Sequence, residues 1–373
     1  MKVATTTLLL CVAGLLALSI VMLYSSSMAD KGTHYLLKQI IWATIGTVAL
    51  LVSASVDYRF FRKIAWIFLG LTAVLLALVI VMNLHTKTNG ARRWFHLGPV
   101  EFQPSELAKL ALIIAVAHYG DRYQRQMKGF EKGILHPCLF IGLILGLIFI
   151  EPDRGTTILM AAVTGTMLIV AGVKWRYITI PTLAGAGLLA ISLCFDTMRS
   201  NRIFAWLHLD EHKKDVGYQA YQAKLAFVLG GLNGVGLGDS REKLGFLPEH
   251  NTDFILPIVG EELGLIATLL VVLAFLMIVI CGVYISYRAS DTFGFLLATG
   301  ITFLIGLQAF INIGVVTSVL PNKGLALPFI SYGGSSLLIM LTCVGVLLSV
   351  ARRARGLERV PPAAALEPVP QMS

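Results

Sequence analysis

Charged side chains are scarce in this 373-residue chain: they make up 14% of it, whereas hydrophobic residues make up 56%. Ordinary soluble domains contain about 25% charged residues. The apolar residues are gathered in blocks of about 20 residues bounded by charges, the length that a helix needs to cross a bilayer. A soluble globular protein is therefore excluded. Because the blocks are continuously apolar, whereas barrel strands alternate, the sequence predicts a helical membrane protein.

Pairs of closely spaced cysteines are also missing. The cysteines lie inside or at the edge of apolar blocks and none forms a CxxC pair, which argues against zinc binding and thiol redox chemistry. Buried, small hydrophobic side chains are the better interpretation. The five residues are Cys11, Cys138, Cys194, Cys281 and Cys343.

Ten transmembrane helices are predicted, so the fold class is an all-α polytopic membrane protein with a long extracytoplasmic loop between helices 7 and 8. The spans are 6–24, 39–56, 64–84, 104–119, 136–150, 156–173, 177–195, 254–287, 292–318 and 328–350. The fourth and fifth are short and are expected to lie among other helices. The first is too long for the apolar region of a signal peptide and is expected to be retained. Residues 1–355 are predicted to form one transmembrane domain, and 356–373, with four prolines, a disordered cytoplasmic tail.

The net charge of +9 arises from Lys and Arg spread over short loops, which membrane topology explains, so no nucleic-acid partner is predicted. With a cytoplasmic N-terminus, fifteen Lys and Arg lie in inside segments and seven in short outside ones. This asymmetry predicts that both termini are cytoplasmic. The loops 85–106, 151–155, 196–253 and 319–335 then share the outer face.

The long loop ends in Phe246-Leu-Pro-Glu-His-Asn-Thr-Asp253-Phe-Ile, where a polar segment enters an apolar helix. A carboxylate there can touch water while its surroundings raise its pKa. Such a group suits a general base, whose pKa should lie near the working pH. Aspartate is also a preferred helix N-cap, so capping by Thr252 or Asp253 explains the pattern equally well.

Two adjacent carboxylates, Glu261 and Glu262, follow inside the same apolar helix. Exposure of either carboxylate to lipid costs about 2.5 kcal/mol or more, so both are expected to face a cavity or polar partners. Pro257 precedes them and is expected to bend the helix.

The segment before the fourth helix contains Arg92-Arg93-Trp94 and ends in Gln-Pro-Ser105-Glu106-Leu-Ala-Lys109. Arginines beside a tryptophan could hold a phosphate and a sugar or lipid, although an aromatic anchor at the membrane interface explains them as well. Glu106 and Lys109 are one turn apart and could pair within the bundle.

Three further segments carry weaker signals. Glu151-Pro-Asp153-Arg154-Gly-Thr156 could bind a metal or pyrophosphate, or form an ordinary tight turn. The glycine-rich run 230–238 lacks the strand and the Lys-Ser pair of a nucleotide-binding loop, so close backbone packing is favoured. Lys323, in the small-residue segment 321–336, is a candidate for binding an anion, or an exposed lysine beside a packing turn.

Together these motifs resemble those of the SEDS glycosyltransferases, the FtsW, RodA and SpoVE group, over about residues 5–355. The most specific are Leu-Pro-Glu249 with Thr-Asp253-Phe-Ile and Gly-Glu-Glu, and Lys323-Gly-Leu with Leu-Pro-Phe-Ile-Ser-Tyr-Gly-Gly-Ser-Ser. Arg-Trp94 with Phe-Gln-Pro-Ser-Glu106, Pro-Asp153-x-Gly-Thr, and Gly217-Tyr-Gln219 with the glycine-rich run support them. Lys-Gly-Leu before Leu-Pro is more similar to the division member than to the elongation member. The family pattern Pro-Glu-x-His-Thr-Asp departs here to His250 followed by Asn251.

The resemblance implies a lipid II polymerase of cell division on the outer face of the cytoplasmic membrane. Asp253 would take the proton of the acceptor sugar's C4 hydroxyl as it attacks C1 of the donor, displacing undecaprenyl pyrophosphate with inversion. The implied cofactor is a divalent cation, Mg or Mn, with unknown ligands, and the implied partners are a class B penicillin-binding protein and other division proteins. The implied substrate-binding residues are Arg93, Trp94, Glu106, Lys109, Gln219, Glu249 and Lys323.

Two other functions fit the same sequence. A flippase for the same lipid suits ten spans with acidic residues inside helices, although transporter sites lie near the middle of the membrane and Asp253 is expected at its outer edge. A non-catalytic division scaffold is the third.

Overall fold

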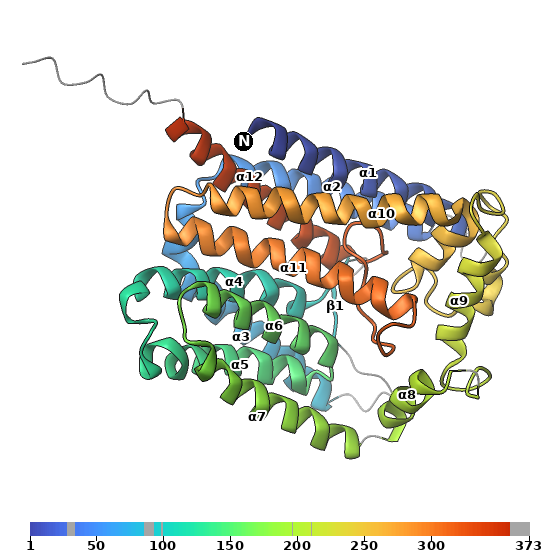
Figure 1. Cartoon of the computed structure of the whole chain (residues 1–373), viewed down its shortest axis with the longest axis horizontal. Coiled ribbons are helices and arrows are strands. Elements are labelled where there is room, and N and C mark those ends of the chain that lie inside the picture. Colours follow the sequence, from blue (N-terminus) through green and yellow to red (C-terminus); the bar gives the residue numbers. More distant parts are fainter. Residues whose placement is uncertain (28–33, 86–92, 98–99, 196, 210, 359–373) are drawn as a thin grey trace, which may run out of the picture.

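The computed structural model describes residues 1–27, 34–85, 93–97, 100–195, 197–209 and 211–358. Ten long helices form the body of the molecule (Figure 1). They are α1 (Lys2–Ser27), α2 (His34–Ser55), α3 (Arg59–His85), α4 (Pro104–Arg122), α5 (His136–Ile150), α6 (Arg154–Val170), α7 (Trp175–Cys194), α10 (Ile255–Tyr287), α11 (Thr292–Val316) and α12 (Gly334–Glu358).

Each of the ten predicted spans coincides with one of these helices, so the all-α class is confirmed. A helix satisfies its backbone hydrogen bonds internally, which the lipid interior requires. By length and composition, seven of the described helices can cross a membrane, and α6, with 17 residues, is a shorter apolar helix. The last span was placed wrongly at 328, because α12 begins at Gly334. Its helix runs to Glu358, three residues into the expected tail, and 359–373 lie outside the described residues.

The centre of the bundle is formed by α4, α11 and α12. Most residues of α4 are buried, as expected for a helix surrounded by others, and α11 packs against α4, α6 and α10. The same expectation is wrong for α5, whose Leu139 and Leu143 are 68% and 58% exposed. This outer position explains why α5 carries no charged residue whereas the enclosed α4 does.

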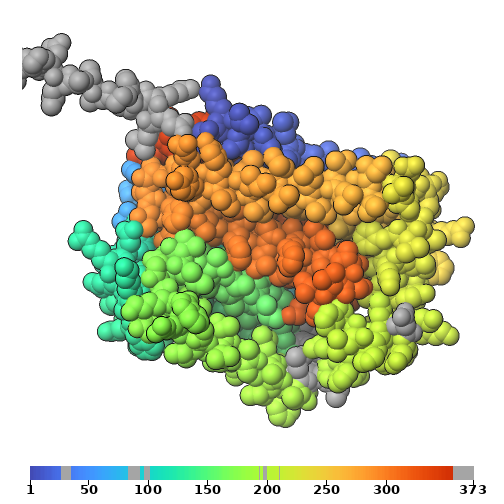
Figure 2. Space-filling view, viewed as in Figure 1, coloured from blue at the N-terminus to red at the C-terminus, as the bar shows by residue number. Residues whose placement is uncertain are grey.

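Short elements not predicted from the sequence lie in the connections on one side of the bundle. The strands β1 (Phe95–Leu97) and β2 (Val100–Phe102) form an antiparallel hairpin before α4. The long loop contains α8 (Thr197–Leu207) and α9 (Tyr218–Gly230), which cover one end of the bundle (Figures 1 and 2). The Trp206 indole N–H donates to the Ser318 carbonyl at 2.9 Å, which joins this loop to the segment after α11.

Helix α10 is broken at Gly264, where φ is 78° and ψ is −176°. The bend expected at Pro257 is wrong, because this proline lies in the first turn of the helix, where a missing N–H costs little. A break inside an apolar helix frees backbone groups that must find partners elsewhere in the protein.

The glycine-rich segment 230–238 supplies those partners. The N–H groups of Val235 and Gly236 donate to the carbonyls of Glu261 and Glu262 at 2.9 and 3.1 Å. A Cβ atom on Gly234 would lie 2.2 Å from the Glu262 carbonyl oxygen, so only glycine allows this approach. The favoured interpretation of close backbone packing is confirmed, with α10 as the surface against which the segment packs.

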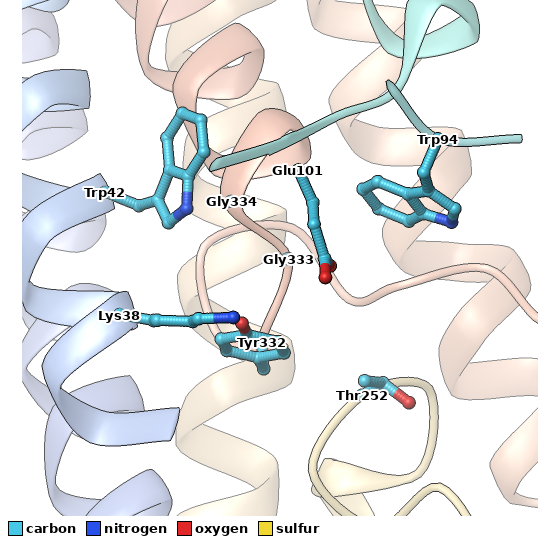
Figure 3. Close-up of a pocket in the computed structure, with 8 residues that line it drawn as sticks. All are labelled: Lys38, Trp42, Trp94, Glu101, Thr252, Tyr332, Gly333 and Gly334. Carbon is cyan, nitrogen blue, oxygen red and sulfur yellow. The ribbon is translucent and has the colours of Figure 1, made fainter. Parts of the chain in front are cut away.

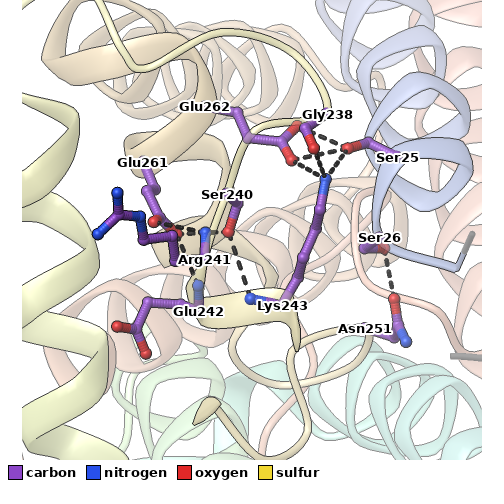
Figure 4. A network of polar contacts seen from close by, with 10 residues as sticks. All are labelled: Ser25, Ser26, Gly238, Ser240, Arg241, Glu242, Lys243, Asn251, Glu261 and Glu262. Atoms are coloured by element: carbon purple, nitrogen blue, oxygen red, sulfur yellow. Dashed lines mark hydrogen bonds and ion pairs between the residues drawn. The ribbon is translucent and has the colours of Figure 1, made fainter. Parts of the chain in front are cut away.

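The carboxylates of Glu261 and Glu262 are 1% exposed and face polar partners, as predicted (Figure 4). Glu262 accepts hydrogen bonds from the Lys243 ammonium at 2.7 Å and from the Ser25 hydroxyl at 2.7 Å. Glu261 accepts from the Arg241 backbone N–H at 2.9 Å. These contacts fasten the end of the long loop to both α10 and α1.

Replacement of Gly264 by alanine should destabilise the protein. Only glycine adopts this backbone conformation freely, and any other residue held in it loses about 1–3 kcal/mol of stability. In addition, the new Cβ would lie 2.4 Å from the Leu232 carbonyl oxygen. Thermal unfolding of the purified protein in detergent measures the loss. Gly146→Ala is the matched control, because nothing lies within 4 Å of its added Cβ in α5. Equal melting temperatures for the two variants would contradict this account of the break.

Candidate active site

Asp253 lies in the turn that leads into α10. The N-cap of α10 is Phe254 and no side chain caps this helix, so the capping interpretation of Asp253 is wrong. The side chain is partly buried, and its carboxylate lies against Gly324: a Cβ atom there would be 2.5 Å from Oδ2. The absence of a side chain at 324 leaves room for the carboxylate between the two loops.

The backbone of this turn is fixed by side chains from distant segments. The Asn312 amide on α11 donates to the carbonyls of Asp253 at 2.8 Å and Leu325 at 2.7 Å, which holds the two loops together. The Ser331 hydroxyl donates to the Thr252 carbonyl at 2.6 Å. The backbone of Asp253 is therefore held in place by contacts from two other segments.

Glu249 and Gln219 shape the same turn. Glu249 has a φ of 56°, and its carboxylate accepts a hydrogen bond from the Thr252 hydroxyl at 2.8 Å. The Gln219 amide on α9 donates to the Pro248 carbonyl at 3.0 Å and accepts from Asn322 at 2.9 Å. Both predicted substrate-binding residues thus have structural contacts beside Asp253.

Arg93 joins the hairpin segment to the turn between α5 and α6. Its guanidinium donates to the carbonyls of Glu151 at 3.1 Å and Pro152 at 2.7 Å and lies 4.0 Å from the Asp153 carboxylate. Asp153 caps α6 by accepting from the Thr156 N–H at 3.1 Å. The Glu151–Thr156 segment is therefore a capped turn, and it lies close enough to Asp253 to influence it electrostatically.

Burial, with Glu249 and Asp153 nearby, raises the pKa of Asp253 to about 7, against an opposing effect of Arg93. Burial and Asp153 likewise raise the pKa of Glu151 to about 8. A carboxylate with a pKa near neutrality can both accept and release a proton under physiological conditions. The predicted shift at Asp253 is present, and burial is its main cause.

Basic residues lie close to these carboxylates. Burial lowers the pKa of Lys323, and Arg154 nearby lowers it further, so the two cations lie within reach of each other. Lys323 directly precedes Gly324, against which the Asp253 carboxylate lies. With Arg93, which lies 4.0 Å from the Asp153 carboxylate, these residues place positive charge beside the acidic group.

Glu106 and Lys109 are buried in the bundle and do form the expected pair. The Lys109 ammonium donates to the Glu106 carboxylate at 2.8 Å and to the Gln308 side chain at 3.0 Å. The Gln308 amide in turn donates to the Ala326 carbonyl at 2.8 Å. Through Gln308, the pair therefore supports the 321–333 segment at Ala326.

Among the described residues, no three His, Cys, Asp or Glu side chains group together as a metal site. The nearest acidic set is Asp253, Glu249 and Asp153, which are linked by their electrostatic effect on Asp253. Magnesium commonly takes one or two protein carboxylates and completes its shell with water and substrate phosphates. The residues fit a divalent cation only as a site completed by substrate.

A protein-family model described as "Cell cycle protein", covering FtsW, RodA and SpoVE, matches residues 3–356. The chain belongs to the FtsW/RodA/SpoVE family. A protein of Geobacter metallireducens named "Probable peptidoglycan glycosyltransferase FtsW" is 42% identical over 358 residues, or 94% of this chain and 95% of the relative. A protein of the same name from Coxiella burnetii is 36% identical and covers 92% and 95% of the two chains.

Solved structures of the FtsW/RodA/SpoVE family share the fold. A chain from a structure described as "Structural coordination of polymerization and crosslinking by a peptidoglycan synthase complex" has a TM-score of 0.75 and 26% identity, over 93% of this chain and 97% of that one. RodA of Thermus thermophilus has a TM-score of 0.68 and 26% identity, over 93% and 96%. The resemblance seen in the motifs is thus confirmed along the whole membrane domain.

The departure from the FtsW/RodA/SpoVE pattern at His250 has a structural explanation. The imidazole is 6% exposed, and its Nδ1 donates to the Leu247 carbonyl at 3.0 Å while Nε2 accepts from the Asn251 amide at 3.0 Å. The Asn251 side chain also accepts from the Ser26 hydroxyl. His250 thus holds Asn251, which fastens this turn to α1.

Several residues that build the site were missed from the sequence. Gln308 and Asn312 on α11 are each 1% exposed and bind the backbone of the Asp253 loop and of the 321–333 segment. Gly324 leaves space for the Asp253 carboxylate. Their signal was present: two amides four residues apart in an apolar helix lie on one face and are costly in lipid. Ser331 had no comparable signal, because its role depends on a contact with Thr252, 79 residues away.

Proposed function

We propose that this protein is a peptidoglycan glycosyltransferase that polymerises lipid II into glycan strands during cell division. The observation that carries the proposal is Asp253, a carboxylate that lies against Gly324, whose pKa burial raises to about 7, and that has basic residues nearby. The names of the FtsW relatives support the reaction and the division role.

The chemistry requires one base and one place for a negatively charged leaving group. Asp253 takes the proton as the C4 hydroxyl of the acceptor sugar attacks C1 of the donor. The new C4–O–C1 bond forms as the bond from C1 to the pyrophosphate oxygen breaks, with inversion at C1. Undecaprenyl pyrophosphate leaves with the bonding electrons. General-base assistance of this kind contributes about 10²–10⁴ in rate.

The developing charge on the pyrophosphate needs positive partners. Lys323 and Arg154 lie beside the Asp253 loop, and Arg93 faces it from the hairpin side. Trp94, next to Arg93, lines a pocket at the same place. A divalent cation held by Asp153 and Glu249 and completed by substrate phosphate would supply further counter-charge. Strand synthesis that continues unchanged when EDTA replaces the ion would contradict this part of the proposal.

The site is proposed to face the outside of the cytoplasmic membrane, with both termini inside, because Lys and Arg are concentrated in the opposite loops. A membrane-impermeant thiol reagent applied to intact cells tests this. In a background in which the five native cysteines are replaced by serine, it should label Asp239→Cys in the long loop and leave Lys63→Cys, near the α2–α3 turn, unlabelled. The reverse pattern would contradict the orientation.

A class B penicillin-binding protein is proposed as the partner that crosslinks the new strand, together with other division proteins. One similar structure comes from a peptidoglycan synthase complex that couples polymerisation and crosslinking. Strand synthesis should rise when this partner is co-purified with the chain, and no response to the partner would count against the pairing.

Asp253→Asn should reduce strand synthesis by about 10²–10⁴-fold, because the amide cannot accept the hydroxyl proton. The assay uses the full-length chain with its transpeptidase partner, lipid II and a divalent ion, and measures glycan strands by gel. Asp239→Asn is the matched control, because this aspartate is exposed in the same long loop.

The outcome separates the rival functions. Undiminished synthesis by Asp253→Asn would reject Asp253 as the base. Movement of labelled lipid across vesicle membranes without any strand synthesis by the unmodified chain would instead favour the flippase.

The rate should also depend on pH in the direction that a base requires. Since burial raises the pKa of Asp253 to about 7, the carboxylate is protonated and inactive below that pH and becomes competent above it. We expect kcat/KM for lipid II to rise through an inflection near pH 7 and the residual activity of Asp253→Asn to lack this inflection. An inflection near pH 4 would show that the carboxylate is solvated like an ordinary aspartate.

A further inference from the structure

The pocket that Trp94 lines opens beside the Asp253 turn. It is named here the indole pocket and has a volume of about 100 Å³. Its wall comes from α2, the hairpin, the turn before Asp253, and the turn before α12 (Figure 3). The lining residues are Lys38, Trp42, Trp94, Glu101, Thr252, Tyr332, Gly333 and Gly334.

The pocket is built around the indole of Trp42. This side chain is 9% exposed and packs against Gly334, where an added Cβ would lie 2.1 Å from the indole nitrogen. The Gly-Gly-Ser-Ser sequence at the start of α12 thus has a partial explanation, because a side chain at position 334 would collide with the indole ring. Gln39 on the same helix contacts the Ser331 carbonyl at 3.5 Å, which holds α2 against this turn.

The pocket is joined directly to the Asp253 turn. Thr252 lines it, and the Thr252 carbonyl is held by Ser331 at 2.6 Å. The backbone N–H of Tyr332 donates to the Asn251 carbonyl at 3.0 Å. The ring of Tyr332 packs edge-on against Tyr35, with centroids 4.9 Å apart. A ligand in the pocket would therefore touch the residue that precedes the proposed base.

The indole pocket is lined by aromatic rings and by both a positively and a negatively charged side chain. The rings of Trp42 and Trp94 stand on two sides, while the Lys38 ammonium, the Tyr332 hydroxyl and the Glu101 carboxylate point toward the centre (Figure 3). Burial and Glu101 raise the pKa of Tyr332 to about 12, so its hydroxyl remains a hydrogen-bond donor.

Such a wall suits an amphipathic ligand with an apolar face and several hydroxyl or amide groups. Binding sites of this kind pair aromatic surfaces with a few placed polar groups that fix orientation. An acyl chain would bury the Lys38 ammonium without replacing its hydration. An anion such as pyrophosphate would meet Glu101 as well as Lys38.

We propose that the indole pocket binds an N-acetylhexosamine ring of the lipid-linked substrate, the ring adjoining the one that reacts at Asp253. The aromatic rings contact the pyranose face, while Lys38, Tyr332 and Glu101 bind its hydroxyl and acetamido groups. The pocket positions the acceptor and takes no part in proton transfer. This inference rests on the function proposed above and specifies how that site selects a sugar.

The test measures binding and turnover in the full-length chain with conservative variants. Lys38→Gln and Tyr332→Phe each remove one polar contact and should together raise the KM for lipid II about tenfold while kcat changes less than twofold, which is the signature of lost substrate binding. Lys63→Gln and Tyr287→Phe are the matched controls, because both side chains are exposed away from the pocket.

A binding measurement that needs no turnover uses Asp253→Asn as the background. Titration with the soluble disaccharide of N-acetylglucosamine and N-acetylmuramic acid should change tryptophan fluorescence saturably, and the two pocket substitutions should weaken the apparent affinity about tenfold.

The results of these experiments separate a failure of the proposed sugar subsite from a failure of the proposed function. If Asp253→Asn abolishes strand synthesis while the pocket substitutions alter neither KM nor disaccharide binding, the sugar subsite is wrong and the proposed function stands. If the unmodified chain makes no strands but the disaccharide still binds in this pocket, the function fails and the sugar subsite remains. Competition by sugar-free undecaprenyl pyrophosphate at equal concentration would assign the pocket to pyrophosphate and overturn the sugar class.

Discussion

Two buried amides on α11 determine the geometry of the site. Asn312 binds the carbonyls of Asp253 and Leu325, and Gln308 binds that of Ala326, so one face of a single helix holds both loops. Inside a membrane protein an unpaired carbonyl is costly, which makes these bonds strong constraints. They keep the loops close enough for the Asp253 carboxylate to lie against Gly324. The Glu106–Lys109 pair extends this support into the centre of the bundle.

The same geometry accounts for the chemistry. Confinement between two loops removes water from the carboxylate and raises its pKa toward neutrality, and the acidic neighbours add to that effect. The basic residues near it come from the hairpin segment and from the segments near 154 and 323. A carboxylate with a raised pKa, basic side chains and an aromatic pocket thus meet at one site. Each comes from a different part of the chain.

The sequence predicted the ten helices well because a bilayer allows few alternatives to long apolar helices. It also predicted the polar environment of Glu261 and Glu262, since charges in lipid require partners. It could not decide between the base and capping interpretations of Asp253, because both produce an aspartate before a helix. The break at Gly264 was missed, since glycines in apolar helices are common in membranes. The indole pocket could not be predicted from the sequence, because Lys38, Glu101 and Tyr332 come from three distant segments.

The most direct test of the account is a structure of the Asp253→Asn chain with lipid II bound as acceptor. The account predicts that the C4 hydroxyl lies within about 3.2 Å of the residue 253 side-chain oxygen, the reach of a general base. The adjoining sugar should lie between Trp42 and Trp94. A bound sugar at the opposite end of the bundle, or a hydroxyl directed away from residue 253, would contradict the central claim.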